Sequence, residues 1–414
     1  MTFYINFAKK SLLAVVSALT ISSFMPVDVN AGDYNIIITK QSQKASENPI
    51  AVFLGVSNNS VLNNEVLKML NLCNWFEIKN TKSNDVMGEY YIKGQVAGAI
   101  LQLGVYDRHK RLKYTVNQLI DANNLSLTAA KVVDKVLKKV FKIKGLCATK
   151  IAFAVQSKVG VKNIYTAYFN GTNSQVLTSN NNLCVEPSWT PSNLSLVYTR
   201  YNKSSTDIVE YNIARRKSRR LIQLPGLNSG GKVSPNGKFL AMVLSKGKTV
   251  DLYVRPLNSK TPIRITKDKA VEAAVTWSPD SKQLCFISDK TGSPRLYLMV
   301  RDGSRVRRLK VLGTEQASPD WSRDNKIVYS AKMGREYAIA VYDLKTGKDT
   351  LITRTSGNWE EPSWAPDNRH IVCSRKIGGG KSDLYIIDSK TKKARKYMSG
   401  RYNLSYPVWS HVIK

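Results

Sequence analysis

Beyond about residue 150, the hydrophobic positions of the chain fall into short apolar segments that recur at a nearly constant interval. Six of these segments end at an anchor position, which is tryptophan in five cases. The anchors are Trp189, Val233, Trp277, Trp321, Trp364 and Trp409. Successive anchors lie 44, 44, 44, 43 and 45 residues apart. A repeat of this period is typical of propellers and other repetitive architectures.

Each interval contains the same order of predicted elements. A turn of Ser, Pro and Asp or Asn follows the anchor, as in Trp277-Ser278-Pro279-Asp280, and these residues suit the positions of a tight turn. A second apolar strand, a polar hairpin, a third strand with an aromatic residue and a short fourth strand follow. The predicted second strands are 194–198, 239–244, 284–288, 327–330 and 371–374. Four strands in about 40–45 residues make one propeller blade.

The two ends of the repeat region complement each other. Residues 151–178 supply three strands with no anchored strand before them, and residues 405–414 supply an anchored strand with nothing after it. We expect these segments to complete one blade together, because a closed ring leaves only short, protected strand edges. The alternative is an open row of hairpins. The predicted fold class is mainly β with a small α/β domain, in which an N-terminal α/β domain precedes a six-bladed β-propeller closed by the C-terminal strand.

The part of the chain before the repeats has a different pattern. Apolar and alternating segments predict strands at 34–39, 49–56 and 90–96, followed by a hairpin over 100–106 and 112–121. Helical spacing of apolar residues predicts helices at 61–72 and 127–143. This mixture indicates a small α/β domain. The second helix has a lysine-rich face, which is either solvated or a docking surface for an acidic partner.

The first 31 residues have the features of a signal peptide. Lys9 and Lys10 precede an apolar stretch, and Val29-Asn30-Ala31 is a small-x-small cleavage site. The apolar stretch is short for a membrane-spanning helix, and the first cysteine is Cys73, so no lipid-attachment cysteine follows the stretch. We expect cleavage after Ala31, a periplasmic location, and no insertion into the envelope membranes. The predicted domains are 1–31 (signal peptide), 32–148 (α/β domain) and 149–414 (propeller).

The charge of the chain is strongly basic. It has 63 Lys and Arg against 30 Asp and Glu, a formal net charge of +33. For an exported protein this balance favours acidic proteins, anionic lipid headgroups or cell-wall polymers over nucleic acid as partners. Arg220, Arg264, Arg308 and Arg395 each follow an anchor by 31 residues. They either discourage pairing of blade edges or form an outer ring that attracts anions.

No combination of residues in the sequence indicates catalysis or a cofactor. The three histidines, His109, His370 and His411, are far apart in the sequence. Gly380-Lys381-Ser382 resembles the end of a phosphate-binding loop, but Arg375 stands where that motif needs glycine. The chain has five cysteines, so at least one has no partner within the chain. Cys285 and Cys373 fall in predicted second strands, where a small apolar core residue explains them, and Cys73 with Cys147 is a possible disulfide within the first domain.

The loops that enter the anchored strands converge on the axial opening of a propeller, where such proteins usually bind their ligands. Acidic residues gather in these loops although the chain is poor in acid. They are Glu186, Glu272, Glu315, Glu360 and Glu361. These carboxylates either receive basic or amide groups of a partner or cap turns beside Pro187 and Pro362.

The whole chain resembles the TolB family, the periplasmic part of the Tol–Pal system. The resemblance rests on the domain order, on the Trp-Ser-Pro-Asp blades and on the closing Pro407-Val408-Trp409-Ser410. Gly94-Gln95-Val96, Lys142-Ile143-Lys144-Gly145 and Ile151-Ala152-Phe153 resemble the family's domain junction. The resemblance implies a non-catalytic, monomeric docking protein without cofactors. It would link a TolA-like inner-membrane protein to a Pal-like lipoprotein and support protein transport, outer-membrane integrity and constriction at cell division.

The resemblance also implies two binding regions. The TolA-contacting N-terminal strand corresponds to Gly32, Asp33, Tyr34, Asn35, Ile36 and Ile37. The Pal-contacting residues at the propeller opening correspond to Glu186, Leu227, Asn228, Ser229, Gly230, Glu272, Ala273, Ser318, Glu361 and Tyr406. The chain departs from the family at Leu227, where a polar residue is expected, and at Gly231-Lys232-Val233, which lacks the usual Pro and aromatic anchor. The alternatives are a basic propeller that binds anionic wall or envelope polymers, and a propeller hydrolase.

Overall fold

The structure, a computed structural model, describes residues 36–37, 48–80, 87–179, 181–245 and 249–413. The contacts divide the chain into two compact units. One unit is built from Thr39–Lys150, Tyr168–Thr172 and Val412–Lys414, and the other from Met1–Ile38, Ile151–Ala167 and Asn173–His411. The predicted signal peptide, 1–31, lies outside the described residues.

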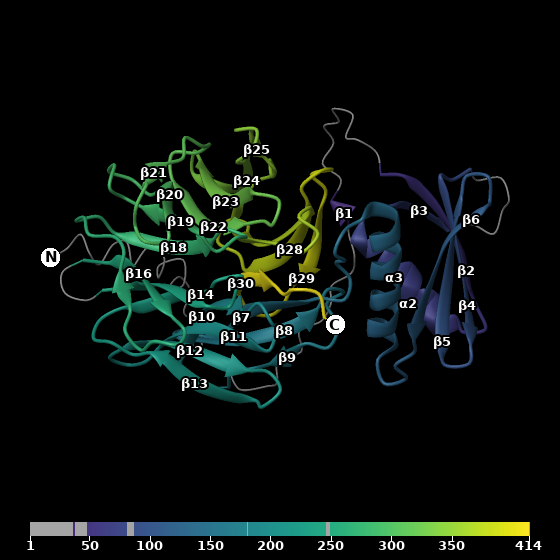
Figure 1. The fold of residues 1–414 in the computed structure, drawn as a ribbon, viewed down its shortest axis with the longest axis horizontal. Helices are drawn as coiled ribbons and strands as arrows, with labels where there is room; N and C mark the ends of the chain where they lie inside the picture. Colours follow the sequence, from purple (N-terminus) through teal and green to yellow (C-terminus); the bar gives the residue numbers. More distant parts are fainter. Residues whose placement is uncertain (1–35, 38–47, 81–86, 180, 246–248, 414) are drawn as a thin grey trace. The chain divides into compact units, whose positions relative to one another are not determined.

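The first unit is an α/β fold with one sheet of strand order β3-β2-β4-β5-β6. In chain order its elements are β2 (Ile50–Ser57), α2 (Ser60–Cys73), β3 (Glu77–Asn80), β4 (Tyr90–Ala97), β5 (Ile100–Asp107), β6 (Leu112–Leu119) and α3 (Leu125–Phe141). Strand β2 pairs in parallel with β3 and β4, and the other pairs are antiparallel. Both helices lie on the same side of the sheet (Figure 1).

Local sequence signals explain where the two helices begin. The side chain of Asn59 accepts a hydrogen bond from the Leu62 amide at 2.9 Å, and Asn124 accepts one from the Leu127 amide at 3.0 Å. Asparagine is a favoured N-cap because it satisfies one of the free amides of the first helical turn. Buried apolar residues then recur at helical spacing and form the core of the unit, as predicted for both helices. Among them are Leu62, Val66 and Leu70 of α2 and Val133, Val136 and Leu137 of α3.

The second unit consists of six antiparallel blades. Five of them are continuous in sequence. The first two are β10 (Leu183–Trp189), β11 (Ser195–Tyr201), β12 (Thr206–Asn212), β13 (Lys217–Ile222), and β14 (Asn228–Val233), β15 (Phe239–Leu244), β16 (Asp251–Pro256), β17 (Ile263–Arg264). The next two are β18 (Glu272–Trp277), β19 (Gln283–Ser288), β20 (Arg295–Val300), β21 (Arg307–Arg308), and β22 (Gln316–Trp321), β23 (Lys326–Met333), β24 (Glu336–Asp343), β25 (Asp349–Leu351). The fifth is β26 (Asn358–Trp364), β27 (His370–Lys376), β28 (Ser382–Asp388), β29 (Ala394–Met398).

The sixth blade closes the ring with both ends of the repeat region, as the sequence predicts. Strand β30 (Leu404–Trp409) pairs antiparallel with β7 (Lys150–Lys158), which is followed by β8 (Val161–Tyr168) and β9 (Gln175–Val176). Trp409 lies opposite Ile151 in the register of this pair. The indole of Trp189 donates a hydrogen bond to the Val408 carbonyl at 3.2 Å, which joins the closing blade to the next one. The predicted fold class is therefore confirmed.

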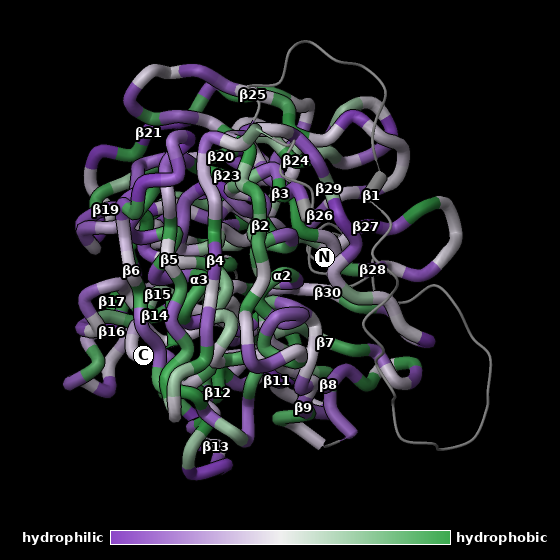
Figure 2. The backbone as a smooth tube through the Cα atoms, turned by 90° about the vertical axis from the view of Figure 1, so that its right-hand side faces the viewer, coloured by the Kyte–Doolittle hydropathy of each residue, from purple (hydrophilic) through white to green (hydrophobic). Residues whose placement is uncertain are grey.

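The anchor tryptophans fill the spaces between neighbouring blades. Trp277, which is 4% exposed, packs in one cluster with Val243 of the preceding blade and Phe286 of its own blade. Burying a large aromatic side chain in this way is a major source of stability. Hydrophobic stretches run along strands such as β7 (Figure 2), whose central residues are all buried.

A short strand from the N-terminal region extends one blade. Strand β1 (Ile36–Ile37) pairs antiparallel with the outer strand β29, so this sheet has the order β1-β29-β28-β27-β26. Ile36 is opposite Arg395 and Ile37 is opposite Ala394. The other residues of the predicted N-terminal binding segment, 32–35, lie outside the described part of the chain.

The five cysteines are all buried, and Cys73 and Cys147 form no disulfide with each other in this structure. The described part of the chain includes no helix with the length and apolar character needed to cross a membrane.

Candidate binding site at the propeller axis

The innermost strand of every blade carries a β-bulge at the same repeat position. The register of each inner pair shifts there, for example between Val185 and Ser188 and between Glu360 and Ser363. The bulge residues all have a left-handed backbone, with φ between 49° and 65°. They are Glu186, Gly230, Ala274, Ser318, Glu361 and Tyr406. Five of the six are not glycine, and a positive φ costs such residues free energy that the surrounding structure must supply.

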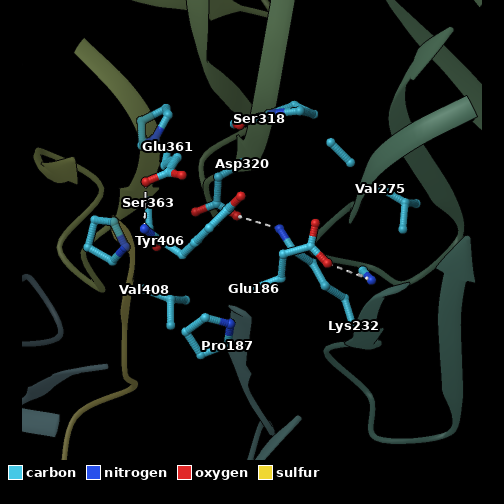
Figure 3. Close-up of a pocket in the computed structure, with 15 residues that line it drawn as sticks. Glu186, Pro187, Lys232, Val275, Ser318, Asp320, Glu361, Ser363, Tyr406 and Val408 are labelled. Carbon is cyan, nitrogen blue, oxygen red and sulfur yellow. Dashed lines mark hydrogen bonds and ion pairs between the residues drawn. The ribbon is translucent and has the colours of Figure 1, made fainter. Parts of the chain in front are cut away.

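These bulges surround a small cavity at the propeller axis, which we call the axial pocket (Figure 3). All six innermost strands contribute to its wall, and its volume is about 110 Å³. The wall is mostly apolar, with the proline after several bulges, and it is interrupted by a few charged groups. The charged groups that line it are Glu186, Lys232, Asp320 and Glu361. A cavity of this size holds several water molecules or a small group of a partner, since one water needs about 10–15 Å³.

The carboxylates of the axial pocket join adjacent blades. The Gly230 amide donates a hydrogen bond to Glu186 Oε2 at 3.0 Å, and the Trp364 amide donates one to Asp320 Oδ2 at 2.8 Å. The Tyr406 amide likewise donates to Glu361 Oε2. Each acceptor is on one innermost strand and each donor is on the next. The acidic residues at the axis therefore hold the ring together, as well as giving the pocket its charge.

A buried lysine balances part of this negative charge. Lys162, on β8, is 3% exposed and donates a hydrogen bond to Ser405 Oγ at 2.9 Å. Its ammonium group also lies 5.3 Å from the centre of the Tyr406 ring, a cation–π distance. Burial lowers the pKa of Lys162, and the charge of Glu361 partly opposes that shift. Burial raises the pKa of Glu361, and Lys162 partly opposes that shift in turn. For both Lys162 and Glu361, the effect of desolvation on the pKa is therefore larger than the opposing effect of their attraction to each other.

A neighbouring carboxyl titrates close to neutral pH. Burial, together with repulsion from Glu361, raises the pKa of Glu360 to about 7. Glu360, which is adjacent in sequence to the lining residue Glu361, is therefore expected to change its protonation state near neutral pH. Such a perturbed carboxyl beside a pocket is a feature of functional sites, although ion-pair networks with a purely structural role produce it too.

The structure brings only part of the predicted opening residues into the axial pocket. Glu186, Gly230, Ser318, Glu361 and Tyr406 line it, whereas the remaining residues of that prediction do not. Those outside the lining are Leu227, Asn228, Ser229, Glu272 and Ala273.

Two of the predicted residues have buried side chains with structural partners. Glu272 is 1% exposed, and its carboxyl contacts the hydroxyls of Thr266 and Ser288, each at 3.1 Å. Burial raises the pKa of Glu272 to about 8, so it is largely protonated at neutral pH. Asn228 is fully buried and its amide donates to the Thr206 carbonyl at 2.9 Å. These two side chains position the entering loops and do not face the opening.

Sequence reasoning missed Lys162, Lys232 and Asp320. Asp320 directly precedes the anchor Trp321, so its place on an innermost strand could have been predicted from the repeat. Lys162 lies on β8, the third strand of the closing blade, and no pattern in its neighbourhood indicates that its side chain is buried beside the axis.

The sequence profile of the TolB beta-propeller domain matches residues 137–413 of the chain, well over half of its length. The chain belongs to the TolB beta-propeller family. Its resemblance to TolB, inferred from the blade pattern, is thereby confirmed.

Individual TolB proteins support this assignment. The chain is 26% identical to the Tol-Pal system protein TolB of Francisella tularensis over 97% of its own length and 92% of that protein. It is 25% identical to the Helicobacter pylori protein of the same name, over 55% of the chain, and the match spans only 56% of that relative. The crystal structure of TolB from Acinetobacter baumannii superposes with a TM-score of 0.80 at 21% identity, covering 89% of the chain and 98% of that structure. At this identity the superposition supports the fold alone.

Proposed function

We propose that this TolB-family protein is a non-catalytic docking component of a Tol–Pal-like system in the periplasm. In this proposal the propeller opening binds a Pal-like lipoprotein, and the segment Gly32–Ile37 binds a TolA-like inner-membrane protein. The link supports outer-membrane integrity and constriction at cell division. The proposal includes cleavage after Ala31 and the domain limits 32–148 and 149–414.

The axial pocket is the observation that carries this proposal. The six bulged innermost strands together form a narrow surface at the propeller axis that is partly apolar and partly charged. The bulge residues hold a left-handed backbone conformation there, which costs free energy at the positions that are not glycine. Concave sites with a few charged groups in an apolar wall are the usual binding sites of proteins. The names of the relatives, which refer to the Tol-Pal system, suggest the class of partner.

The groups that a propeller hydrolase would use do not favour catalysis. His370 is 1% exposed, and its Nδ1 lies 2.6 Å from Asp367 Oδ2, which is itself buried. Glu361 already accepts hydrogen bonds from Tyr406 and Ser374. Within the described ranges, no three His, Cys, Asp or Glu side chains are grouped so as to hold a metal ion. These observations support a binding role over a hydrolytic one.

A charge reversal tests whether the opening binds a Pal-like lipoprotein. Lys232 lines the axial pocket with its ammonium group 4.0 Å from Asp320, so Lys232→Glu places two carboxylates side by side there. The matched control is Lys238→Glu, an exposed residue beyond the same strand with the same change in net charge. We expect Lys232→Glu to weaken binding of the lipoprotein's soluble domain at least 10-fold in calorimetry, and Lys238→Glu to leave it unchanged. Equal affinities of all three proteins would reject the site.

Deletion of residues 32–37 tests the second binding region. The backbone of Ile36 and Ile37 is already paired with β29, so a partner strand would have to add to the free edge of β1 or replace β29. We expect the deletion to abolish binding of the periplasmic domain of the TolA-like protein while lipoprotein binding remains. Retained TolA binding would place that contact elsewhere.

Binding of anionic wall or envelope polymers is a second candidate function, favoured by the outer blade edges. Lys217, Arg219 and Arg220 on β13 and Arg307 and Arg308 on β21 are all exposed. Such binding is electrostatic, and the Debye length falls from about 10 Å at 0.1 M salt to about 3 Å at 1 M. Retention on an anionic polymer that is unchanged between these salt concentrations would exclude this function.

A further inference from the structure

One blade lacks the tryptophan that packs against its neighbour in the other five. Trp277 closes the space between its blade and the preceding one, and its indole donates a hydrogen bond to the Lys232 carbonyl at 2.9 Å. The indole of Trp189 likewise donates a hydrogen bond to the carbonyl of Val408, on the innermost strand of the closing blade. At the equivalent position of the blade β14–β17 stands Val233, which is only partly buried. The indole is therefore missing between the blades β10–β13 and β14–β17.

A cavity lies between these two blades, and we call it the inter-blade groove. Its volume is about 550 Å³, within the usual range of about 300–1,000 Å³ for ligand pockets. Val197 and Leu221 line it from one blade, and Val233 and Leu257 line it from the other. The hydroxyl-bearing turn that follows Trp189 forms part of its rim. The groove and the axial pocket have no lining residue in common.

The surroundings of the inter-blade groove are strongly basic. Glu210 is the one acidic residue of the lining, and its Oε2 already pairs with Arg219 Nε at 2.6 Å. The segment around Arg219 carries further exposed cations, namely Arg215, Arg216, Lys217 and Arg220. This concentration of positive charge next to a groove with a mixed apolar and polar lining favours an anionic occupant.

The geometry of the adjacent strand favours an extended occupant. Strand β13 has six residues and pairs with β12 on one side, and no other strand of the described chain pairs with it. Its backbone is therefore available to a segment that adds to the sheet edge, as in peptide recognition by strand addition. From that edge a side chain of the added segment can reach the groove, which Arg219 and Leu221 of β13 line.

We propose that the inter-blade groove binds an aromatic side chain carried by an extended acidic segment of a partner protein. The aromatic ring enters the groove that lies between the two blades where the anchor indole is missing, from the side lined by Arg219 and Leu221. Carboxylates on either side of it pair with the cations of β13 and of the turn before β13. This site does not depend on the role of the axial pocket.

The test uses the mature protein and the fluorescein-labelled peptide Asp-Asp-Trp-Asp-Asp, blocked at both ends, in fluorescence anisotropy at low salt. We expect saturable binding that weakens at least 10-fold when alanine replaces the peptide's tryptophan. Val233→Trp restores the indole of the other blades and should also weaken binding at least 10-fold. Equal affinity of the tryptophan and alanine peptides, or unchanged affinity of a folded Val233→Trp protein, overturns the proposal.

A second variant keeps the test informative if Val233→Trp does not fold. Leu194 lines the groove and is 63% exposed, so Leu194→Asp adds a carboxylate to the rim with little effect on the core. We expect at least a 5-fold loss of peptide affinity. The matched control is Leu119→Asp in the α/β unit, where the leucine is 67% exposed. Equal losses in the two variants would show a general charge effect and reject the groove. Binding of free indole without binding of the peptide would also reject a protein segment as the occupant.

Discussion

The stability of the propeller should depend on the last strand of the chain. Trp409 is 5% exposed and lies opposite Ile151, about 250 residues earlier in the sequence. Replacing a buried tryptophan by alanine typically costs about 3–5 kcal/mol. For a domain of this size each kcal/mol lowers the melting temperature by about 2–4 °C. We therefore expect Trp409→Ala to lower the propeller's melting temperature by about 6–20 °C in calorimetry.

The control for this prediction is another anchor of the same repeat. Trp321 is only partly buried and belongs to a blade that is continuous in sequence. Trp321→Ala should therefore lower the melting temperature less than Trp409→Ala does. Ending the chain after Asn403 removes the whole of β30, including the fully buried Leu404, and should destabilise the propeller more than either substitution. A truncated protein that melts at the wild-type temperature would refute the closure of the ring by this strand.

Three further predictions concern single positions. The folded-state pKa of Glu360 is raised to about 7, so its ionisation opposes folding, and the free energy of unfolding should fall as pH rises from about 4.5 to 7. Glu360→Gln should be more stable than wild type at pH 8, by at most about 3 kcal/mol. At pH 4 thermal melts should show the two proteins to be equally stable. Asp134 accepts hydrogen bonds from three backbone amides at 2.7–2.8 Å, so Asp134→Ala should destabilise the α/β unit by about 2–4 kcal/mol in urea unfolding, and a loss below 1 kcal/mol would contradict this. Gly303 and Gly292 have φ values of +89° and +90°, but a Cβ at Gly303 would lie 2.4 Å from the Ile265 carbonyl oxygen, whereas a Cβ at Gly292 would meet open space. Thermal melts should therefore show Gly303→Ala to be the more destabilised of the two alanine variants. Equal decreases in melting temperature for the two variants would exclude the steric explanation.

Most of the fold could be predicted from the sequence because two periodicities are strong. The strand predicted at 239–244 is β15 (Phe239–Leu244), and the helix predicted at 61–72 is α2 (Ser60–Cys73). The anchors recur at nearly constant spacing because each blade places one large apolar residue at the same interface. Closure of the ring followed from counting strands at the two ends of the repeat region.

The candidate site was less accessible to sequence reasoning. A left-handed conformation at Glu186 or Tyr406 has no local signal, because neither residue favours a positive φ. The burial of Lys162 depends on the packing of other strands around it. Val233 was visible in the sequence as a departure from the anchor pattern, but the groove that results depends on how closely two blades approach. Local patterns thus predicted the elements, whereas the cavities depend on tertiary packing.

The pairing of β7 with β30 has a consequence for how the protein is made. Ile151 and Trp409 are partners in one sheet although 258 residues separate them. At a synthesis rate of about 5–20 residues per second, β7 leaves the ribosome roughly 13–50 s before its partner exists. During that interval β7 presents an unpaired apolar edge, a hazard for misassembly with other chains. A chain that stopped before Leu404 would leave that edge of β7 without its partner strand.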